Sequence, residues 1–350
     1  MKIAMCADLH LSGGEREWSL EVLKELVSKA ESASPVLFIG GDLFDSLDDA
    51  EKLRKDYEAI IEASHLDQVI WAAGNHDSKN PSGHQALATL GQLSFGKKTM
   101  LVYDIRKGVD DKETNPIHVT RNSEFELIVI PYLEKPEWYS YASLPDKRAK
   151  RIILAHGTHA DIAISEEAET SLFPRDFDRL YEADFMLLGH IHKHYKAANW
   201  LYPGSARVWR RGEDSEHGFI IYDTQTDAVT FVPLISGGSY KKISLFVESV
   251  LPKFSIPDMP YLYLDVELYG TVSDDTQANA IKHELAHILQ PRCLKFTIND
   301  ENLKTTALLA QNPVWDAFNH ALESKRQSLE PELIDCARRL FMERILVKKK

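Results

Sequence analysis

Up to about residue 235 the chain alternates short apolar runs with helical patterns, and this alternation constrains its fold more than any other feature. The runs read as strands, and they are KIAMCA, VLFIG, VIWAA, LIVIP, RIILA, DFMLL and GFIIYD. Between the first two runs, apolar residues recur at the spacing of an amphipathic helix, at Trp18, Val22, Leu23, Leu26, Val27 and Ala30. Residues 217–234 read as two strands joined by a turn at Thr226 and Asp227. We therefore predict an α/β domain with a hairpin closing one edge of the sheet.

The remainder of the chain has a different pattern. SGGS at 236–239 is typical of a flexible joint. After it, LYLDVELYG, a helical pattern over 278–289 and LKFTIND predict a small β-α-β domain. From residue 312 two apolar stripes predict two helices, with Pro331 suited to begin the second. The predicted domains are residues 1–238, 239–303 and 304–350.

The composition limits the classes of protein to which this chain can belong. The 350 residues are 44% hydrophobic and 27% charged, as in globular proteins. No apolar run approaches the length of a membrane span, and Asp8 interrupts the N-terminus too early for a secretory signal, so we expect a cytoplasmic protein. The three scattered cysteines indicate neither disulfides nor a zinc knuckle. A net charge of −12 argues against a protein that binds nucleic acid by neutralising many of its phosphates. Arg207, Arg210 and Arg211 nevertheless form a local basic group that could guide a nucleic-acid strand.

Polar residues follow five of the apolar runs. They are Asp8 and His10; Asp42; Asn75, His76 and Asp77; His156; and His190 and His192. Because ligands bind at the carboxyl ends of strands in open α/β sheets, we expect these side chains to converge. If the chain stays extended after Gly189, His190 and His192 lie on one side of it. Oxygen and nitrogen donors without thiolate suit manganese, iron or zinc, and a carboxylate such as Asp42 can bridge two cations. Two such metals indicate phosphoester hydrolysis.

The motifs DLH, GDLFD, GNHD, HGT and GHIH, in that order, resemble those of the calcineurin-like metallophosphoesterases. The resemblance implies two β-sheets flanked by helices and a pair of divalent metals. It implies one metal held by Asp8, His10, Asp42 and His192, and another held by Asp42, Asn75, His156 and His190. His76 is left as the group that stabilises the transition state or protonates the leaving oxygen, with Asp77 orienting its ring.

A narrower resemblance covers FDRLYEADFMLLGHIHKH and YPGSARVWRRGEDSEHGFIIYD, which look like the nuclease subunit of bacterial SbcCD complexes and its meiotic-recombination relatives. Gly204 and Ser205 occupy the turn that follows the last histidines in those proteins. The resemblance implies a manganese-dependent 3′ to 5′ exonuclease on duplex ends, with endonuclease action on single strands or hairpins, in double-strand-break repair. It also implies a capping domain that positions DNA, terminal helices that dock on an SbcC-type ATPase, and a possible homodimer.

Several points stay open. Archaeal and eukaryotic relatives usually carry histidine where Asp45 stands, so a histidine role at DNA ends does not transfer. The stripes of the terminal helices equally suit packing on the chain's own core. His159 and His194 are weaker candidates for lining the substrate groove. The alternative function is a small-molecule or nucleotide phosphodiesterase of the same superfamily, while the complete ligand set argues against a non-catalytic scaffold.

HELAH, from His283 to His287, matches the HExxH pattern of zinc peptidases. No further histidine follows at metzincin spacing, and the small domain offers little room for a substrate cleft. The apolar stripe of Ile281, Leu285, Ile288 and Leu289 predicts instead an ordinary helix that presents the two histidines to solvent.

Overall fold

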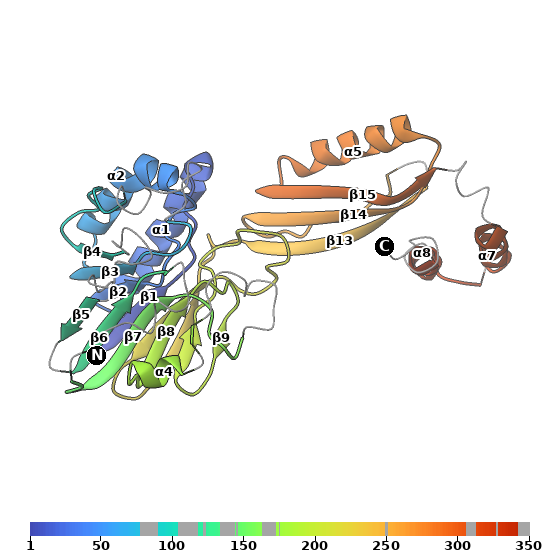
Figure 1. Cartoon of the computed structure of the whole chain (residues 1–350). Helices are drawn as coiled ribbons and strands as arrows, with labels where there is room; N and C mark the ends of the chain where they lie inside the picture. The colour runs from blue at the N-terminus through green and yellow to red at the C-terminus, as the bar shows by residue number, and fades with distance from the viewer. Residues whose placement is uncertain are drawn as a thin grey trace, which may run out of the picture. The chain divides into compact units, whose positions relative to one another are not determined.

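The computed structural model describes residues 1–77, 90–103, 118–121, 124–133, 144, 146–162, 173–174, 176–248, 251–305, 313–326 and 328–341. Its contacts divide the chain into two compact units, Met1–Gly238 and Ser239–Lys350 (Figure 1). The fold is mixed α/β, with two large sheets flanked by helices in the first unit, as predicted.

The first unit holds two six-stranded sheets. The order of the first sheet is β12 (Val229–Pro233), β11 (Gly218–Asp223), β1 (Lys2–Cys6), β2 (Val36–Ile39), β3 (Gln68–Ala72) and β4 (Thr99–Val102). The order of the second is β5 (His118–Arg121), β6 (Phe125–Ile130), β7 (Lys150–His156), β8 (Phe185–Gly189), β10 (Trp200–Tyr202) and β9 (Tyr195–Lys196). β1 to β3 run parallel, as do β6 to β8, so the carboxyl ends within each set lie at one edge of its sheet. β11 and β12 form the predicted hairpin, with β12 at the edge of the first sheet.

The two sheets pack face to face, and strand periodicity assigns each side chain to a layer. In β6, Leu127 and Val129 join the core between the sheets, whereas Ile128 and Ile130 join a second cluster with Phe177 of α4 (Phe177–Leu180). Burial on both faces explains why these strands read as continuous apolar runs rather than alternating ones. A short η1 (Gly13–Glu15) leads into α1 (Arg16–Glu31), and α1 and α2 (Leu47–Ala63) lie along the first sheet (Figure 1).

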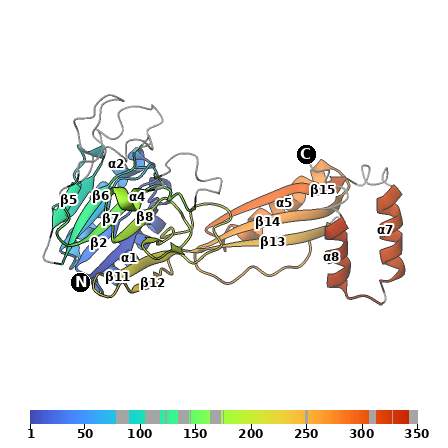
Figure 2. The same ribbon diagram turned by 60° about the horizontal axis from the view of Figure 1, so that its bottom comes forward.

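The second unit contains a parallel three-stranded sheet, β13 (Ser239–Glu248), β14 (Leu262–Val272) and β15 (Lys295–Thr305). α5 (Asp275–Leu289) connects β14 to β15 (Figure 2). This helix buries Ile281, Leu285 and Leu289. Asp274 caps this helix by accepting from the backbone N–H of Gln277. The predicted β-α-β elements are therefore confirmed, with β13 as an additional strand.

Two helices end the described chain, α7 (Pro313–Ser324) and α8 (Pro331–Phe341), and the second begins at Pro331 as predicted. Phe341 of α8 contacts the rings of Trp315 and Phe318 at centroid distances of 5.6 and 4.2 Å, so the helices pack on each other. Their apolar side chains are nevertheless divided between interior and surface. Trp315 and Ile334 are buried, while Val314, Leu333 and Leu340 are 56%, 57% and 44% exposed. Within the described ranges, no helix is both long and apolar enough to cross a membrane.

Candidate metal centre

The strand ends bring the predicted ligands to one place. Asp8 follows β1, Asp42 follows β2 and Asn75 follows β3, while His156 ends β7 and His190 and His192 follow β8. Backbone bonds tie these ends together, with the N–H of Gly40 donating to Cys6 O at 2.9 Å and that of Gly157 to Gly189 O at 3.1 Å. Side chains separated by up to 184 positions, from Asp8 to His192, thus share one buried centre.

Four of the predicted ligands adopt positive φ, which non-glycine residues rarely do. The φ angles are 52° at Asp8, 45° at His10, 49° at Asp42 and 100° at His190. The chain is therefore not extended after Gly189, so the condition under which His190 and His192 would lie on one side is not met. The turn at His190 instead sends the two imidazoles to different parts of the centre. Such backbone strain costs roughly 1–3 kcal/mol per residue and is concentrated at functional sites.

Glycines in the motifs make room for the ligands. A Cβ at Gly41, whose φ is +95°, would lie 2.0 Å from His156 Nδ1. A Cβ at Gly74 would lie 2.2 Å from Asp42 Oδ1. The glycines of GGD and GNHD are thus required by the close approach of ligand side chains to the backbone.

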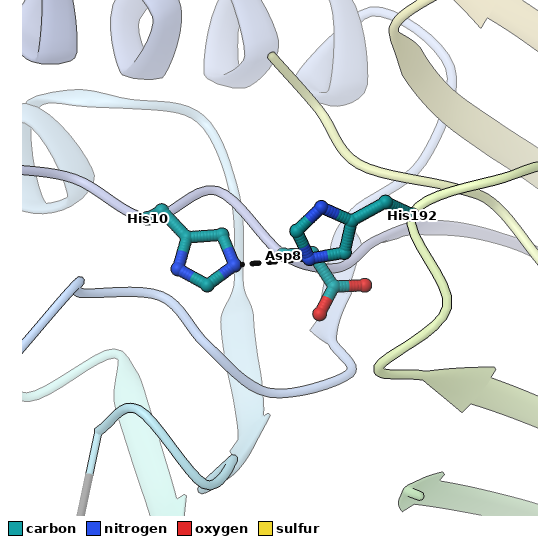
Figure 3. A group of neighbouring side chains, drawn as sticks. All are labelled: Asp8, His10 and His192. Atoms are coloured by element: carbon teal, nitrogen blue, oxygen red, sulfur yellow. Dashed lines mark hydrogen bonds between the residues drawn. The ribbon is translucent and has the colours of Figure 1, made fainter. Parts of the chain in front are cut away.

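Asp8, His10 and His192 form what we call the first half of the centre, with ligand atoms within 4.8 Å of one another (Figure 3). His10 Nε2 and His192 Nε2 face each other at 3.2 Å, an arrangement that a shared cation would satisfy. Burial is the main cause that lowers the pKa of His10 to about 4, so its ring is neutral and able to bind a metal. Asp8 is held in place by the backbone N–H of His190, 3.1 Å from each carboxylate oxygen.

Asn75, His156 and His190 form the second half. Asn75 Oδ1 lies 3.0 Å from His156 Nε2 and 3.1 Å from His190 Nδ1. Asp42 lies between the halves, because its Oδ2 is 3.9 Å from His10 Nε2 and 3.5 Å from His156 Nε2. Burial raises the pKa of Asp42, but the nearby His156 and His10 outweigh it and hold that pKa well below the usual range. An ionised carboxylate in this position is suited to bridge two cations.

His76 lies beside the centre, as the motif predicts. Its backbone N–H donates to Asp42 Oδ1 at 2.7 Å, and its ring lies within 4.8 Å of the ligand atoms of His10 and Asp42. Its ring Nδ1 is 3.1 Å from the carbonyl oxygen and 3.4 Å from the carboxylate of Asp45. Asp45, a residue to which the sequence assigns no role, therefore orients this ring through its backbone carbonyl oxygen, with its carboxylate close by.

Asp77, which we predicted in that orienting role, is placed differently. Its buried carboxylate accepts from the backbone N–H groups of Phe44 at 2.9 Å and Gly74 at 2.8 Å, and from Trp71 Nε1 at 3.2 Å. These bonds fold the GNHD segment against the loop that follows β2. Asp77 therefore acts on the backbone that carries Asn75 and His76, and the prediction that it orients the His76 ring is corrected.

Arg207 is also not where the sequence suggests. It is 1% exposed and donates from Nε to Leu9 O at 2.7 Å and from Nη1 to Glu15 Oε2 at 3.1 Å, with its guanidinium over the Trp18 ring. It therefore braces the backbone beside His10 and cannot guide a DNA strand. Arg210 and Arg211, the other two members of the basic group, are exposed.

Two residues of the centre escaped the sequence analysis. The Trp209 ring stacks on His10 at a centroid distance of 4.1 Å and an interplanar angle of 11°. Glu213 Oε1 lies 2.5 Å from His192 Nδ1, the ring nitrogen that faces away from His10. Burial opposes the charge of Glu213, but its bond with His192 prevails and lowers the carboxyl pKa to about 2. Neither residue follows a strand or belongs to one of the five metal-site motifs, so the available signal was their place in YPGSARVWRRGEDSEHGFIIYD, the segment that carries the narrower resemblance.

The remaining histidine candidates lie outside the two halves. His159 is buried, and its ring stacks on Trp200 at 4.9 Å. His194 is exposed, with its ring centroid 5.6 Å from that of Phe231. In α5, Ile281, Leu285 and Leu289 are buried while His283 and His287 are exposed, as expected for an ordinary helix.

Comparison with known proteins assigns the family. A family model described as calcineurin-like phosphoesterase matches residues 1–194, more than half of the chain. The chain belongs to this family. It is therefore a metal-dependent hydrolase that acts on phosphoester bonds. A search of curated proteins found no match.

Solved structures with a similar fold include three phosphoesterases. A purple acid phosphatase from yellow lupin is 14% identical, with 66% of this chain and 52% of that chain covered and a TM-score of 0.41. A dimetal phosphatase from Danio rerio is 12% identical, covering 63% and 91%, with a TM-score of 0.37. The phosphoesterase Yfce from E. coli is 16% identical, covering 67% and 99%, with a TM-score of 0.29. The chain thus spans about half the length of the lupin enzyme.

The donor set and its geometry fit two divalent cations, one in each half with Asp42 shared. Cations at such a site supply Lewis acidity toward a phosphate oxygen and activate the attacking water. The residues of the chain hold these ions and position the ester, while the His76 ring stands beside Asp42, able to move a proton to a leaving oxygen. The backbone carbonyl of Asp45 holds that ring in orientation through Nδ1.

Proposed function

We propose that this chain is a manganese-dependent DNA nuclease that acts with an SbcC-type ATPase in double-strand-break repair. The observation that carries the proposal is the convergence of both halves on Asp42, which suits a site that holds a phosphodiester between two cations. The proposed reactions are 3′ to 5′ exonuclease action on duplex ends and endonuclease action on single strands or hairpins. In each, water attacks phosphorus in line and His76 protonates the leaving oxygen.

The preference for DNA over a small ester rests on the sequence outside the metal motifs. Residues 177–194 and 202–223 resemble the bacterial double-strand-break nuclease subunits. The elements β14, α5 and β15 provide the β-α-β piece that a capping domain over residues 239–303 requires. We assign to it the positioning of DNA for the metal centre in residues 1–238.

The terminal helices are proposed to bind the ATPase. Val314, Leu333 and Leu340 expose 56%, 57% and 44% of their surface, although Trp315 and Ile334 are already buried within the second unit. Exposed apolar side chains on amphipathic helices favour docking against another helix, such as the root of a coiled coil. Residues 304–350 would then be the partner-binding segment.

The test uses linear duplex DNA labelled at either the 3′ or the 5′ end, in manganese, with and without an SbcC-type ATPase and ATP. We expect 3′ to 5′ shortening that the partner and ATP enhance, and no cleavage by the Asp42→Asn variant. Hydrolysis of bis(p-nitrophenyl) phosphate alone, even with the partner present, would contradict the proposal and favour a small-molecule phosphodiesterase. Because the net charge is −12, the isolated chain should bind long duplex DNA weakly and with steep salt dependence.

A further inference from the structure

Trp209 occupies an unusual position for a large aromatic side chain. All the ring contacts found for it in the described part of the chain are to imidazoles of the site. They are the stack on His10 and edge contacts with His76 and His192 at 5.0 and 5.3 Å. The indole is only partly buried, unlike the core tryptophans Trp18 and Trp71. A phosphoester held by the first half would therefore lie next to a flat, accessible aromatic surface.

The segment that carries Trp209 is anchored at both ends. Arg207 is buried and bonded to the backbone of Leu9. Glu213 is largely buried, and its Oε2 accepts from the backbone N–H groups of Trp209 at 2.6 Å and Arg210 at 3.2 Å. The other oxygen of the same carboxylate contacts His192. The indole is thus preorganised relative to a metal ligand, as a binding surface requires.

We propose that Trp209 is a stacking platform for a nucleobase of the substrate, adjacent to the phosphate that the centre cleaves. Base stacking on an aromatic side chain tolerates any base, because every base has a π-face, and it therefore suits a nuclease without sequence preference. The inference deepens the proposed function and rests on it for the choice of a nucleobase. A duplex end would have to present an unpaired terminal base to this surface.

The charge beside the indole supports the same class of ligand. The Arg210 guanidinium lies over the indole ring, 5.5 Å from its centroid, and it is exposed, so a stacked base would have to share this face with it or displace it. Its Nε is 3.5 Å from Glu213 Oε1, so the same carboxylate orients it. An aromatic surface next to an arginine matches a nucleotide, which presents a flat base and a phosphate together.

The test compares two competitive inhibitors of bis(p-nitrophenyl) phosphate hydrolysis in manganese. Thymidine 5′-monophosphate carries a base, whereas 2-deoxyribose 5-phosphate is the same sugar phosphate without one. In the wild-type chain we expect the base to tighten inhibition by roughly 5- to 150-fold. The ratio of the two inhibition constants should fall toward one in Trp209→Leu and persist in Trp209→Phe. Manganese bound per chain is measured for each variant.

Two results would overturn the platform. One is equal inhibition by both compounds in the wild-type chain. The other is that Trp209→Leu weakens inhibition by both compounds equally and also binds less manganese. This would mean that the indole only supports His10. Failure of the proposed nuclease function would be seen separately, as the absence of DNA cleavage. If no DNA is cut but the wild-type chain still prefers thymidine 5′-monophosphate, and Trp209→Leu loses this preference, the platform stands and the substrate is a nucleotide.

Discussion

The two halves of the metal centre are oriented by different kinds of partner. In the first half, carboxylates stand behind the imidazoles, with Asp45 Oδ1 3.4 Å from His10 Nδ1 and Glu213 Oε1 2.5 Å from His192 Nδ1. In the second half, a backbone group takes this place, because His156 Nδ1 lies 2.7 Å from the carbonyl oxygen of Gly40.

The difference shows which parts of the chain each half depends on. Carboxylates behind metal-bound histidines raise ligand basicity and fix ring orientation, and their loss weakens metal binding. The first half therefore depends on Glu213, which lies outside the motifs, and on the segment that follows Arg207. Among the described residues, the second half is held by motif residues and by the backbone carbonyl of Gly40, which directly precedes the GDLFD motif.

The largest effect is expected where the halves meet. Asp42→Asn keeps a side chain that tolerates positive φ but removes the shared charge. We expect manganese affinity to fall at both halves by more than about 100-fold, beyond the loss typical of outer-sphere changes, and hydrolysis to disappear. Metal analysis after dialysis measures this. Retention of one tightly bound ion would show that Asp42 serves a single half.

His76→Ala tests a residue that belongs to neither half. Turnover should fall by about 100- to 10,000-fold because a positioned proton donor is lost. Both manganese ions should remain bound, as measured in the same dialysis experiment. If metal is lost together with turnover, His76 is a ligand and our division of the centre is wrong.

Gly41→Ala should damage the second half selectively. The new Cβ would lie 2.0 Å from His156 Nδ1 and push this ring away from Gly40. We expect the free energy of unfolding to fall by about 1–3 kcal/mol. Metal binding should weaken in the second half and stay unchanged in the first. Gly212→Ala is the matched control, because Gly212 has a φ of +88° but no atom within 4 Å of the new Cβ. Equal loss of metal in both variants would point to backbone strain rather than the clash.

Glu213→Gln should weaken the first half alone. Removing the charge behind His192 is expected to lower manganese affinity at one site by about 10- to 100-fold. A two-site calorimetric titration separates this from the second half. Glu216→Gln provides the control, since Glu216 is an exposed acid in the same segment. Two results would refute the contrast between the halves. One is that Glu216→Gln also weakens manganese binding at one site, and the other is that Glu213→Gln weakens both sites equally.

The smallest effect is expected remote from both halves, at Glu25 of α1. Burial opposes its charge, but bonds with Lys29 and Ser236 prevail and lower its pKa to about 2. Its stabilisation is therefore fully present above the ordinary value of 4.5 and is lost as the pH falls toward 2. Glu25→Gln should lower the free energy of unfolding by less than about 1 kcal/mol at neutral pH, because solvent screens the partly exposed group. Chemical denaturation at pH 7 and pH 2.5 should show this difference shrinking, while metal binding at pH 7 is unchanged.

The same contrast explains what the sequence could predict. Asp8, Asp42 and His156 were found because each follows an apolar strand, and parallel strands bring their ends together. The hairpin of β11 and β12 and the helix α5 were found because their periodicities persist over whole elements. The motif residues of both halves could therefore be named before their positions were known.

Other features depend on tertiary packing that no local pattern reports. Arg207 reads as one of three surface arginines, yet the pocket formed by Trp18, Glu15 and the backbone of Leu9 buries it. Trp209 and Glu213 lie in an irregular segment, and only the folded chain brings them to His10 and His192. The strands β4 and β5 were not predicted, because most of their side chains are only partly buried and they include polar residues, so they form no continuous apolar run like that of the equally short β2.

Anomalous scattering from crystals soaked in manganese tests the central claim most directly. Our account predicts two peaks about 3.5–4 Å apart. One should be bounded by Asp8, His10 and His192, the other by Asn75, His156 and His190, with the Asp42 carboxylate touching both. A single peak, or two peaks without Asp42 between them, would contradict it.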